Sequence, residues 1–308
     1  MLLQDFSTLT PNELQPLLER IAPGCRLVKI EPLEGSFSNL THLLRLRADN
    51  GAETRLVARR YAVTNPEAQR IKARREYHAL QRLQNTAVPV ARPLHLDEYG
   101  AYLGRPGLLM AFVPGRLVLA PPYPHGRIEQ LARTLVAIHS VAVDPASEQD
   151  LMDANAEVLW FLRSRPDMPE YIARHPLGAR LWAVVLAHEE KVQHTQTHLT
   201  HVDYWSGNVL WDGDQLAAVV DWEEAAYGEP GIDVAYCRMD LALSNDPIDA
   251  ERFLQQYEIH AGRPVADLGF WELTAAVRAM LNPEGWISES PSKERFEHFV
   301  LDALNRLA

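Results

Sequence analysis

The sequence of 308 residues contains little cysteine and no long apolar run. Its two cysteines, Cys25 and Cys237, provide neither a disulfide framework nor a Cys-x-x-Cys zinc motif. It has no stretch of about eighteen apolar residues, so we expect no membrane span and no membrane partner. The opening residues, MLLQDFSTLTPNEL, lack the basic start and apolar core of a secretory signal. These absences predict a protein of the reducing cytoplasm.

Positive charge is also scarce. The chain has 30 Lys and Arg against 41 Asp and Glu, which gives a formal net charge of -11. Without a basic excess to neutralise phosphates, we expect no nucleic-acid partner. With 47% apolar and 23% charged residues, the composition is that of an ordinary globular protein. The length suggests roughly two domains or lobes.

In the first third of the chain, the order of three strands, a helix and further strands predicts a small antiparallel sheet that carries one helix. A helix is predicted to begin at Thr10-Pro11-Asn12-Glu13, where an N-cap residue precedes a proline. An amphipathic helix is predicted over about residues 65–84. The predicted strands are CRLVKIEPL, NLTHLLRLRA, TRLVARRYAV and RPGLLMAF.

Val113-Pro114-Gly115 is the best candidate for a boundary, because the chain is mostly helical after it. We therefore predict an α+β protein with a β-rich N-terminal lobe (1–113) and a mainly helical C-terminal lobe (114–308). Predicted helices cover residues 127–140, 154–163 and 177–193, with three or four more after Ile232. One exception is a hairpin predicted over residues 197–222, around the turn Asp212-Gly213-Asp214.

Three polar residues cluster around this hairpin. Asp203 precedes Asn208 by five residues, and Asp221 ends the strand that follows the turn. If the two strands pair, Asn208 and Asp221 meet at one end of the hairpin and the preceding loop brings Asp203 there. An amide oxygen and a carboxylate suit Mg²⁺, which prefers few protein ligands. Asp203 is then the candidate base that takes a proton from an attacking hydroxyl, as phosphoryl transfer requires.

Less specific readings of the same residues remain open. Asp203 and Asn208 are also typical turn-capping residues, and we expect His201 to be structural. His194, His198, His201 and Asp203 lie close enough in sequence for a zinc site, although a zincin would have Glu where Thr195 stands.

The segment HVDYWSGN (201–208), followed by Val220-Asp221-Trp222-Glu223, resembles the aminoglycoside phosphotransferase and choline-kinase-like superfamily. Members are small-molecule kinases with a protein-kinase-like fold of two lobes. Gly228-Glu229-Pro230 followed by Asp233 is similar to that family's Gly-Asp-Pro segment, and Asp233 would support the loop. Val202 replaces the glycine that usually precedes the catalytic Asp, a change we regard as tolerated.

The resemblance also implies a nucleotide site in the first lobe. The turn containing Gly35, Ser36 and Ser38 would cover the phosphates of ATP or GTP. Arg59 would stand where protein kinases have lysine, with Glu76 as its partner on the helix. In the segment LLMAFVPG (108–115), Met110 and Phe112 would lie beside the base.

Together these residues predict an ATP-dependent phosphotransferase that acts on a small-molecule hydroxyl. Asp203 would be the base, and Asn208 and Asp221 would hold Mg²⁺. The acceptor would be an aminoglycoside, an amino alcohol or a choline-like or sugar-like compound. The alternative is a catalytically silent nucleotide-binding pseudokinase or regulatory protein. Such a protein would be expected to lack Asp203, Asn208 or Asp221, and this sequence contains all three. A protein kinase fits less well, because Asp-Phe-Gly and Ala-Pro-Glu are missing. The sequence does not identify a protein partner.

Overall fold

A computed structural model describes residues 9–33, 39–119, 123–146, 149–192, 197–287 and 290–307. They divide into two compact units. The first unit contains the chain up to Pro114 together with Val220–Glu223, and the second contains residues 115–219 and 224–308. The sheet of the first unit and the helices of the second confirm the predicted α+β class. The functional roles assigned to the two lobes stay predictions.

The first unit is built on a five-stranded antiparallel sheet with the order β1-β2-β3-β5-β4. The predicted strand stretches are all present, whereas β4 was missed because it begins at a proline. The strands are β1 (Cys25–Pro32), β2 (Asn39–Ala48), β3 (Glu53–Tyr61), β4 (Pro93–Asp97) and β5 (Gly107–Ala111).

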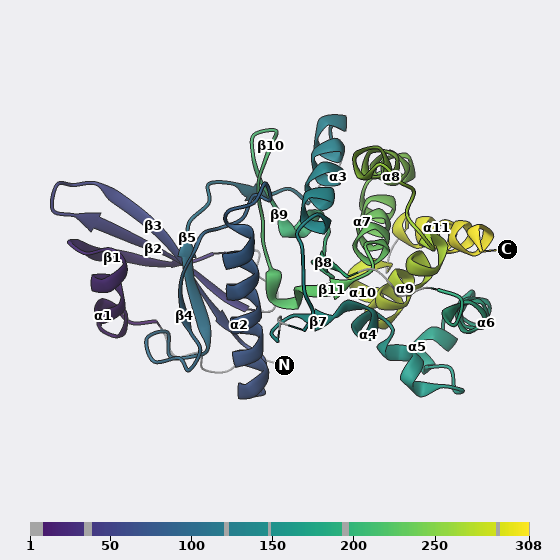
Figure 1. Cartoon of the computed structure of the whole chain (residues 1–308), viewed down its shortest axis with the longest axis horizontal. Coiled ribbons are helices and arrows are strands. Elements are labelled where there is room, and N and C mark those ends of the chain that lie inside the picture. The colour runs from purple at the N-terminus through teal and green to yellow at the C-terminus, as the bar shows by residue number, and fades with distance from the viewer. Residues whose placement is uncertain are drawn as a thin grey trace. The chain divides into compact units, whose positions relative to one another are not determined.

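Two helices complete this unit. Helix α1 (Pro11–Ile21) begins with a capping box between Thr10 and Glu13 and packs its leucines on the leucines of β2 and β3. Helix α2 (Pro66–Leu83), capped by Asn65, lies along β4 and β5 (Figure 1). Because side chains alternate along a strand, β3 presents successive residues to different faces of the sheet.

The second unit contains the predicted hairpin. Strands β9 (Val209–Asp212) and β10 (Gln215–Val219) pair across the Gly213 turn, and β6 (Arg116–Leu117) pairs with β9. A second small sheet consists of β7 (Met152–Asp153), β8 (His198–Thr200) and β11 (Ala226–Gly228). The register pairs Val209 with Val219, so Asn208 precedes the paired end of the hairpin and Asp221 follows it.

Helices make up the rest of the second unit. Helix α7 is buried along nearly its whole length and packs against α8, α9 and α11 (Figure 1). Its first residue must be small, because a Cβ at Gly231 would lie 2.2 Å from the Trp271 ring. The helices are α3 (His125–His139), α4 (Ala154–Val158), α5 (Glu170–Ala173), α6 (Gly178–Glu189), α7 (Gly231–Ser244), α8 (Pro247–Ala261), α9 (Leu268–Leu281), α10 (Pro283–Trp286) and α11 (Ser292–Arg306).

Two helix predictions need correction. The helix predicted over 154–163 is α4 followed by a 3₁₀ turn at Trp160–Ser164. The described chain after Ile232 forms five helices instead of three or four, because the single-turn α10 is too short to produce a helical period. Within the described residues, no helix is long and apolar enough to cross a membrane.

Candidate active site

In the first unit, a buried arginine lies among three carboxylates. Arg59 is on the face of β3 that looks towards α2, and its side chain is 8% exposed. Its Nε atom lies 3.0 Å from Oε2 of Glu76, the partner that the sequence suggested. Its Nη2 atom forms an ion pair with Asp221 and lies 3.3 Å from Oε2 of Glu223. Arg60 points to the opposite face and donates to the carbonyl of Leu103.

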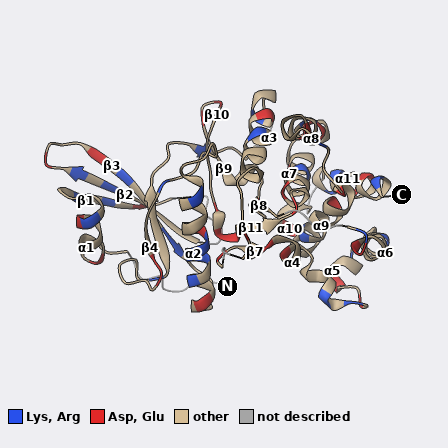
Figure 2. Ribbon diagram, in the orientation of Figure 1, with Lys and Arg blue, Asp and Glu red and all other residues tan. Residues whose placement is uncertain are grey.

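Glu223 connects three parts of this unit, although it was not among the residues predicted to form the site. Lys72 Nζ on α2 lies 2.6 Å from Glu223 Oε1, and Asn39 Nδ2 on β2 donates to Oε2. Arg75 Nη1 donates to the Glu223 carbonyl over 2.9 Å. Lys72 precedes Glu76 by four residues on α2, and residues four apart lie on the same face of a helix. This spacing is the sequence signal that could have placed Lys72 beside Glu76. Figure 2 shows basic residues recurring along α2.

Burial and charge act against each other in this cluster. Burial raises the pKa of Glu76 to about 7, against the opposing effect of Arg59. Burial also works to raise the pKa of Glu223, but Arg59 and Lys72 outweigh it and lower that pKa. The hydroxyl of Tyr61 donates to Glu76. The cluster therefore places a fixed cation between acids of unequal strength.

Asp221 has an unusual backbone. Its φ of 67° lies in the left-handed region, which Asp and Asn tolerate better than most residues. Carboxylate oxygens of Glu76, Asp221 and Glu223 all lie within 4.8 Å of one another, which is close enough to share a metal ion. Oxygen ligands of this kind suit Mg²⁺.

In the second unit, Asp203 and Asn208 are hydrogen-bonded to each other. Asn208 Nδ2 donates to Oδ2 of Asp203 and to its backbone carbonyl, both over 2.8 Å. The amide nitrogen is thus engaged, and Oδ1 of Asn208 is the atom available as a ligand. The Asp203 side chain is 27% exposed, so an incoming hydroxyl can reach it.

Asp233 connects the loop before Asp203 to helix α7. Its carboxylate accepts the backbone N–H of His201 over 2.8 Å and that of Val202 over 2.7 Å. It also lies 3.1 Å from Nε2 of His139 on α3. His201 is fully buried. These contacts attach the loop to α7 and α3, and the supporting role predicted for His201 and Asp233 stays a prediction.

Val202 is strained. Its φ is 69°, in the left-handed region, where a β-branched side chain is a genuine outlier. The conformation costs about 1–2 kcal/mol for a residue with a Cβ. Where the resemblance implied glycine, valine thus needs other contacts to stabilise this backbone.

Arg278 on α9 is a neighbour of Asp203 that sequence reasoning missed. Its Nη1 donates to the Val202 carbonyl over 2.7 Å, and its Nη2 lies 3.4 Å from Oδ1 of Asp203. The guanidinium carbon of Arg278 lies 4.3 Å from the centre of the Tyr236 ring, and its Nη2 atom lies 3.7 Å from Oε2 of Glu224. No local pattern predicts a contact between residues 75 positions apart.

For the other residues predicted to bind the nucleotide, the structure gives less information. Gly35, Ser36 and Ser38 lie outside the described residues. Met110 is buried in β5 opposite Val57, and Phe112 lies under the Arg55 guanidinium. Their predicted roles beside a nucleotide base stay predictions.

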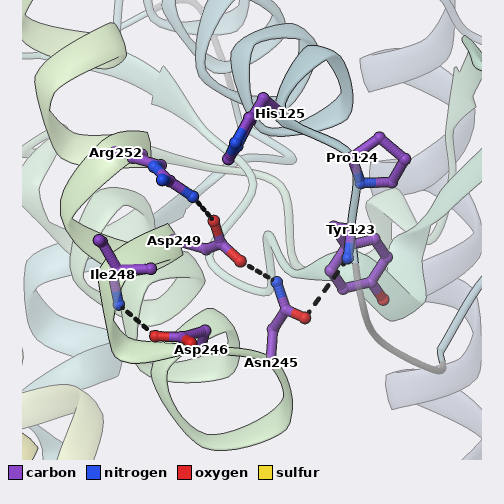
Figure 3. A pocket seen from close by; sticks show the side chains of 8 residues that line it. All are labelled: Tyr123, Pro124, His125, Asn245, Asp246, Ile248, Asp249 and Arg252. Carbon is purple, nitrogen blue, oxygen red and sulfur yellow. Dashed lines mark hydrogen bonds and ion pairs between the residues drawn. The ribbon is translucent and has the colours of Figure 1, made fainter.

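A pocket of about 690 Å³ lies where α3 and α8 begin (Figure 3), and none of the predicted site residues lines it. Its polar groups pair with one another. Asn245 contacts both Asp249 and the Tyr123 N–H, and Arg252 contacts Asp249. Asp246 accepts the N–H of Ile248 at the start of α8. These pairings stabilise helix ends and identify no ligand.

Comparison with known proteins decides the family. Residues 29–268 match the family described as "Phosphotransferase enzyme family". The chain belongs to this family. The predicted resemblance is therefore confirmed, and the prediction of a phosphotransferase is confirmed at the level of the family.

A curated protein matches most of the chain at low sequence identity. The chain is 28% identical over 229 residues to mouse "Acyl-CoA dehydrogenase family member 10", a match that covers 68% of this chain but 20% of that protein. The chain thus spans about a fifth of the length of this curated relative.

Solved structures share the phosphotransferase fold. Macrolide 2'-phosphotransferase MphH from Brachybacterium faecium is 18% identical, with a TM-score of 0.60 over 96% of this chain and 98% of that chain. Aminoglycoside 2'-phosphotransferase-IIIa, solved as a GDP complex, is 14% identical, with a TM-score of 0.61 over 97% of both chains. At these identities the likeness concerns the fold, and it confirms the predicted kinase-like architecture.

Proposed function

We propose that this phosphotransferase-family protein transfers the γ-phosphate of ATP or GTP to a hydroxyl of a small molecule. The observation that carries the proposal is the Asp203–Asn208 pair, in which a partly exposed carboxylate is oriented by an amide whose oxygen is left for another ligand. The family match and the nucleotide bound in a structural neighbour support it. The acceptor would be an aminoglycoside, an amino alcohol or a choline-like or sugar-like compound.

Asp203 would orient the acceptor hydroxyl and take its proton. The acceptor oxygen then forms a bond to the γ-phosphorus, the bond from that phosphorus to the β–γ bridging oxygen breaks, and the nucleoside diphosphate leaves. Positioned acid–base help of this kind contributes roughly 10²–10⁴-fold. Arg59, oriented by Glu76, would pair with the nucleotide phosphates.

Asn208 and Asp221 would supply the ligands of Mg²⁺. Their oxygen atoms are of the type that this ion prefers, and Asn208 Oδ1 is left available by the bonds of its amide nitrogen. Bound Mg²⁺ would neutralise charge on the nucleotide phosphates.

The test is phosphate transfer from ATP and GTP to a panel of hydroxylated small molecules, with the wild type beside Asp203→Asn. We expect turnover of at least one acceptor, a loss of roughly 10²–10⁴-fold in the variant, and unchanged nucleotide affinity. Wild-type turnover in Asp203→Asn would remove the base from the mechanism. Nucleotide binding by the wild type without transfer to any acceptor would favour the silent pseudokinase or regulatory protein.

A further inference from the structure

Arg278 contacts both the strained residue and the base. Its two Nη atoms reach the carbonyl of Val202 and the carboxylate of Asp203, at 2.7 and 3.4 Å. The forked guanidinium group can make both contacts from one side chain, which a lysine ammonium cannot match in geometry. The position of the base is therefore coupled to a side chain on a distant helix.

Both backbone groups of Val202, the N–H and the carbonyl, form hydrogen bonds with side chains. Asp233 accepts its N–H over 2.7 Å, and Arg278 donates to its carbonyl over 2.7 Å. These two bonds oppose the tendency of a β-branched residue to leave the left-handed region. Loss of either bond would allow the backbone to relax, and Asp203 is the next residue in the chain.

The surroundings fix Arg278 itself. The ring of Tyr236 covers its guanidinium, and Glu224 balances its charge. Burial raises the pKa of the Tyr236 phenol well above its ordinary value, and Asp203 raises it further against the opposing effect of Arg278, so this ring stays neutral beside the cation. A cation this constrained can set the direction of a carboxylate.

We propose that Arg278 is a positioning residue, which keeps Val202 in its left-handed conformation and thereby aims the Asp203 carboxylate at the acceptor hydroxyl. The proposal rests on the proposed function of Asp203. A misplacement of about 1 Å can lower a rate by up to about 100-fold. Arg278→Gln should therefore lower kcat by about 10-fold to 100-fold and leave KM for ATP unchanged, because the nucleotide phosphates are assigned to Arg59.

The decisive variant is Val202→Gly combined with Arg278→Gln. Glycine adopts φ > 0 without steric cost, so the double variant should recover much of the kcat that Arg278→Gln loses. Arg278→Lys keeps the charge but lacks the fork, and it should recover less. A matched control is Arg295→Gln, which removes another arginine bond to a backbone carbonyl, that of Leu243, and involves neither Val202 nor Asp203. It should leave kcat unchanged.

Coupling between Val202 and Arg278 can be measured without activity. The Tm loss caused by Arg278→Gln should be smaller in the Val202→Gly background than in the wild type. If the wild type transfers no phosphate, the proposed function fails, whereas additive Tm changes would overturn the proposed backbone coupling. Wild-type kcat in Arg278→Gln, or no rescue by glycine, would also overturn it. Should Arg278→Gln not fold, Arg278→Lys takes its place, and wild-type kcat there would refute the role.

Discussion

At the scale of the residue, the charge at position 221 can be changed without disturbing the backbone. Asp221 has φ of 67°, and Asn tolerates this left-handed conformation as well as Asp does. Asp221→Asn therefore removes a charge while keeping shape. Since the residue is proposed to bind Mg²⁺, and an uncharged amide oxygen attracts this ion less strongly than a carboxylate, we expect Mg²⁺ to raise nucleotide affinity less in the variant than in the wild type.

Calorimetric titration of ATP under both conditions tests this expectation. The matched control is Asp214→Asn, at an exposed acid in the hairpin turn that contacts Arg127. This control should keep the full effect of Mg²⁺. An Asp221→Asn protein whose affinity depends on Mg²⁺ as strongly as that of the wild type would assign the ion to other ligands.

At the scale of the element, His139 joins three helices. It lies near the end of α3, and its ring contacts Asp233 on α7 and the hydroxyl of Tyr257 on α8, at 3.1 and 2.7 Å. Burial lowers the pKa of His139, against the opposing effect of Asp233, while His198 and Arg263 lower it further. The neutral ring donates from Nε2 to Asp233 and accepts at Nδ1 from Tyr257.

This arrangement predicts a loss of stability in mild acid. Below the unfolded pKa of about 6.5, the unfolded chain binds a proton that the folded protein resists, so the free energy of unfolding falls as pH falls. Thermal unfolding between pH 7.5 and 5 should show a smaller Tm decrease for His139→Gln than for the wild type. The control His260→Gln, at an exposed histidine of α8, should retain the wild-type slope. An equal slope in His139→Gln would contradict the assignment.

Sequence reasoning succeeded for elements whose signals are local. The hairpin was predicted because two apolar runs flank Asp212-Gly213-Asp214, and turn chemistry together with strand alternation determines such a structure. Contacts between distant segments could not be predicted in this way. Arg278 meets Asp203 through the packing of α9, and Glu223 meets Lys72 through the folding of the first unit.

At the scale of the whole molecule, the first unit is formed by two separate parts of the chain. Val220–Glu223 joins the sheet and α2 after the chain has passed through residues 115–219. Glu223 forms ion pairs with Arg59 and Lys72 inside the first unit. Because Val220–Glu223 follows directly after β10 in the sequence, these ion pairs attach the segment after β10 to the first unit. Unfolding of one unit should therefore be coupled to unfolding of the other.

A nucleotide can report this coupling. At 100 times its Kd, MgATP should raise the free energy of unfolding by about 2.7 kcal/mol. Six of the seven tryptophans lie in the second unit, and Trp222 lies in the first. If the units unfold together, urea curves from tryptophan fluorescence and far-UV circular dichroism should coincide and move together on addition of MgATP. Two transitions, of which only one moves, would show that the units unfold independently. EDTA should reverse the shift, because Mg²⁺ is proposed to hold the nucleotide through Asn208 and Asp221.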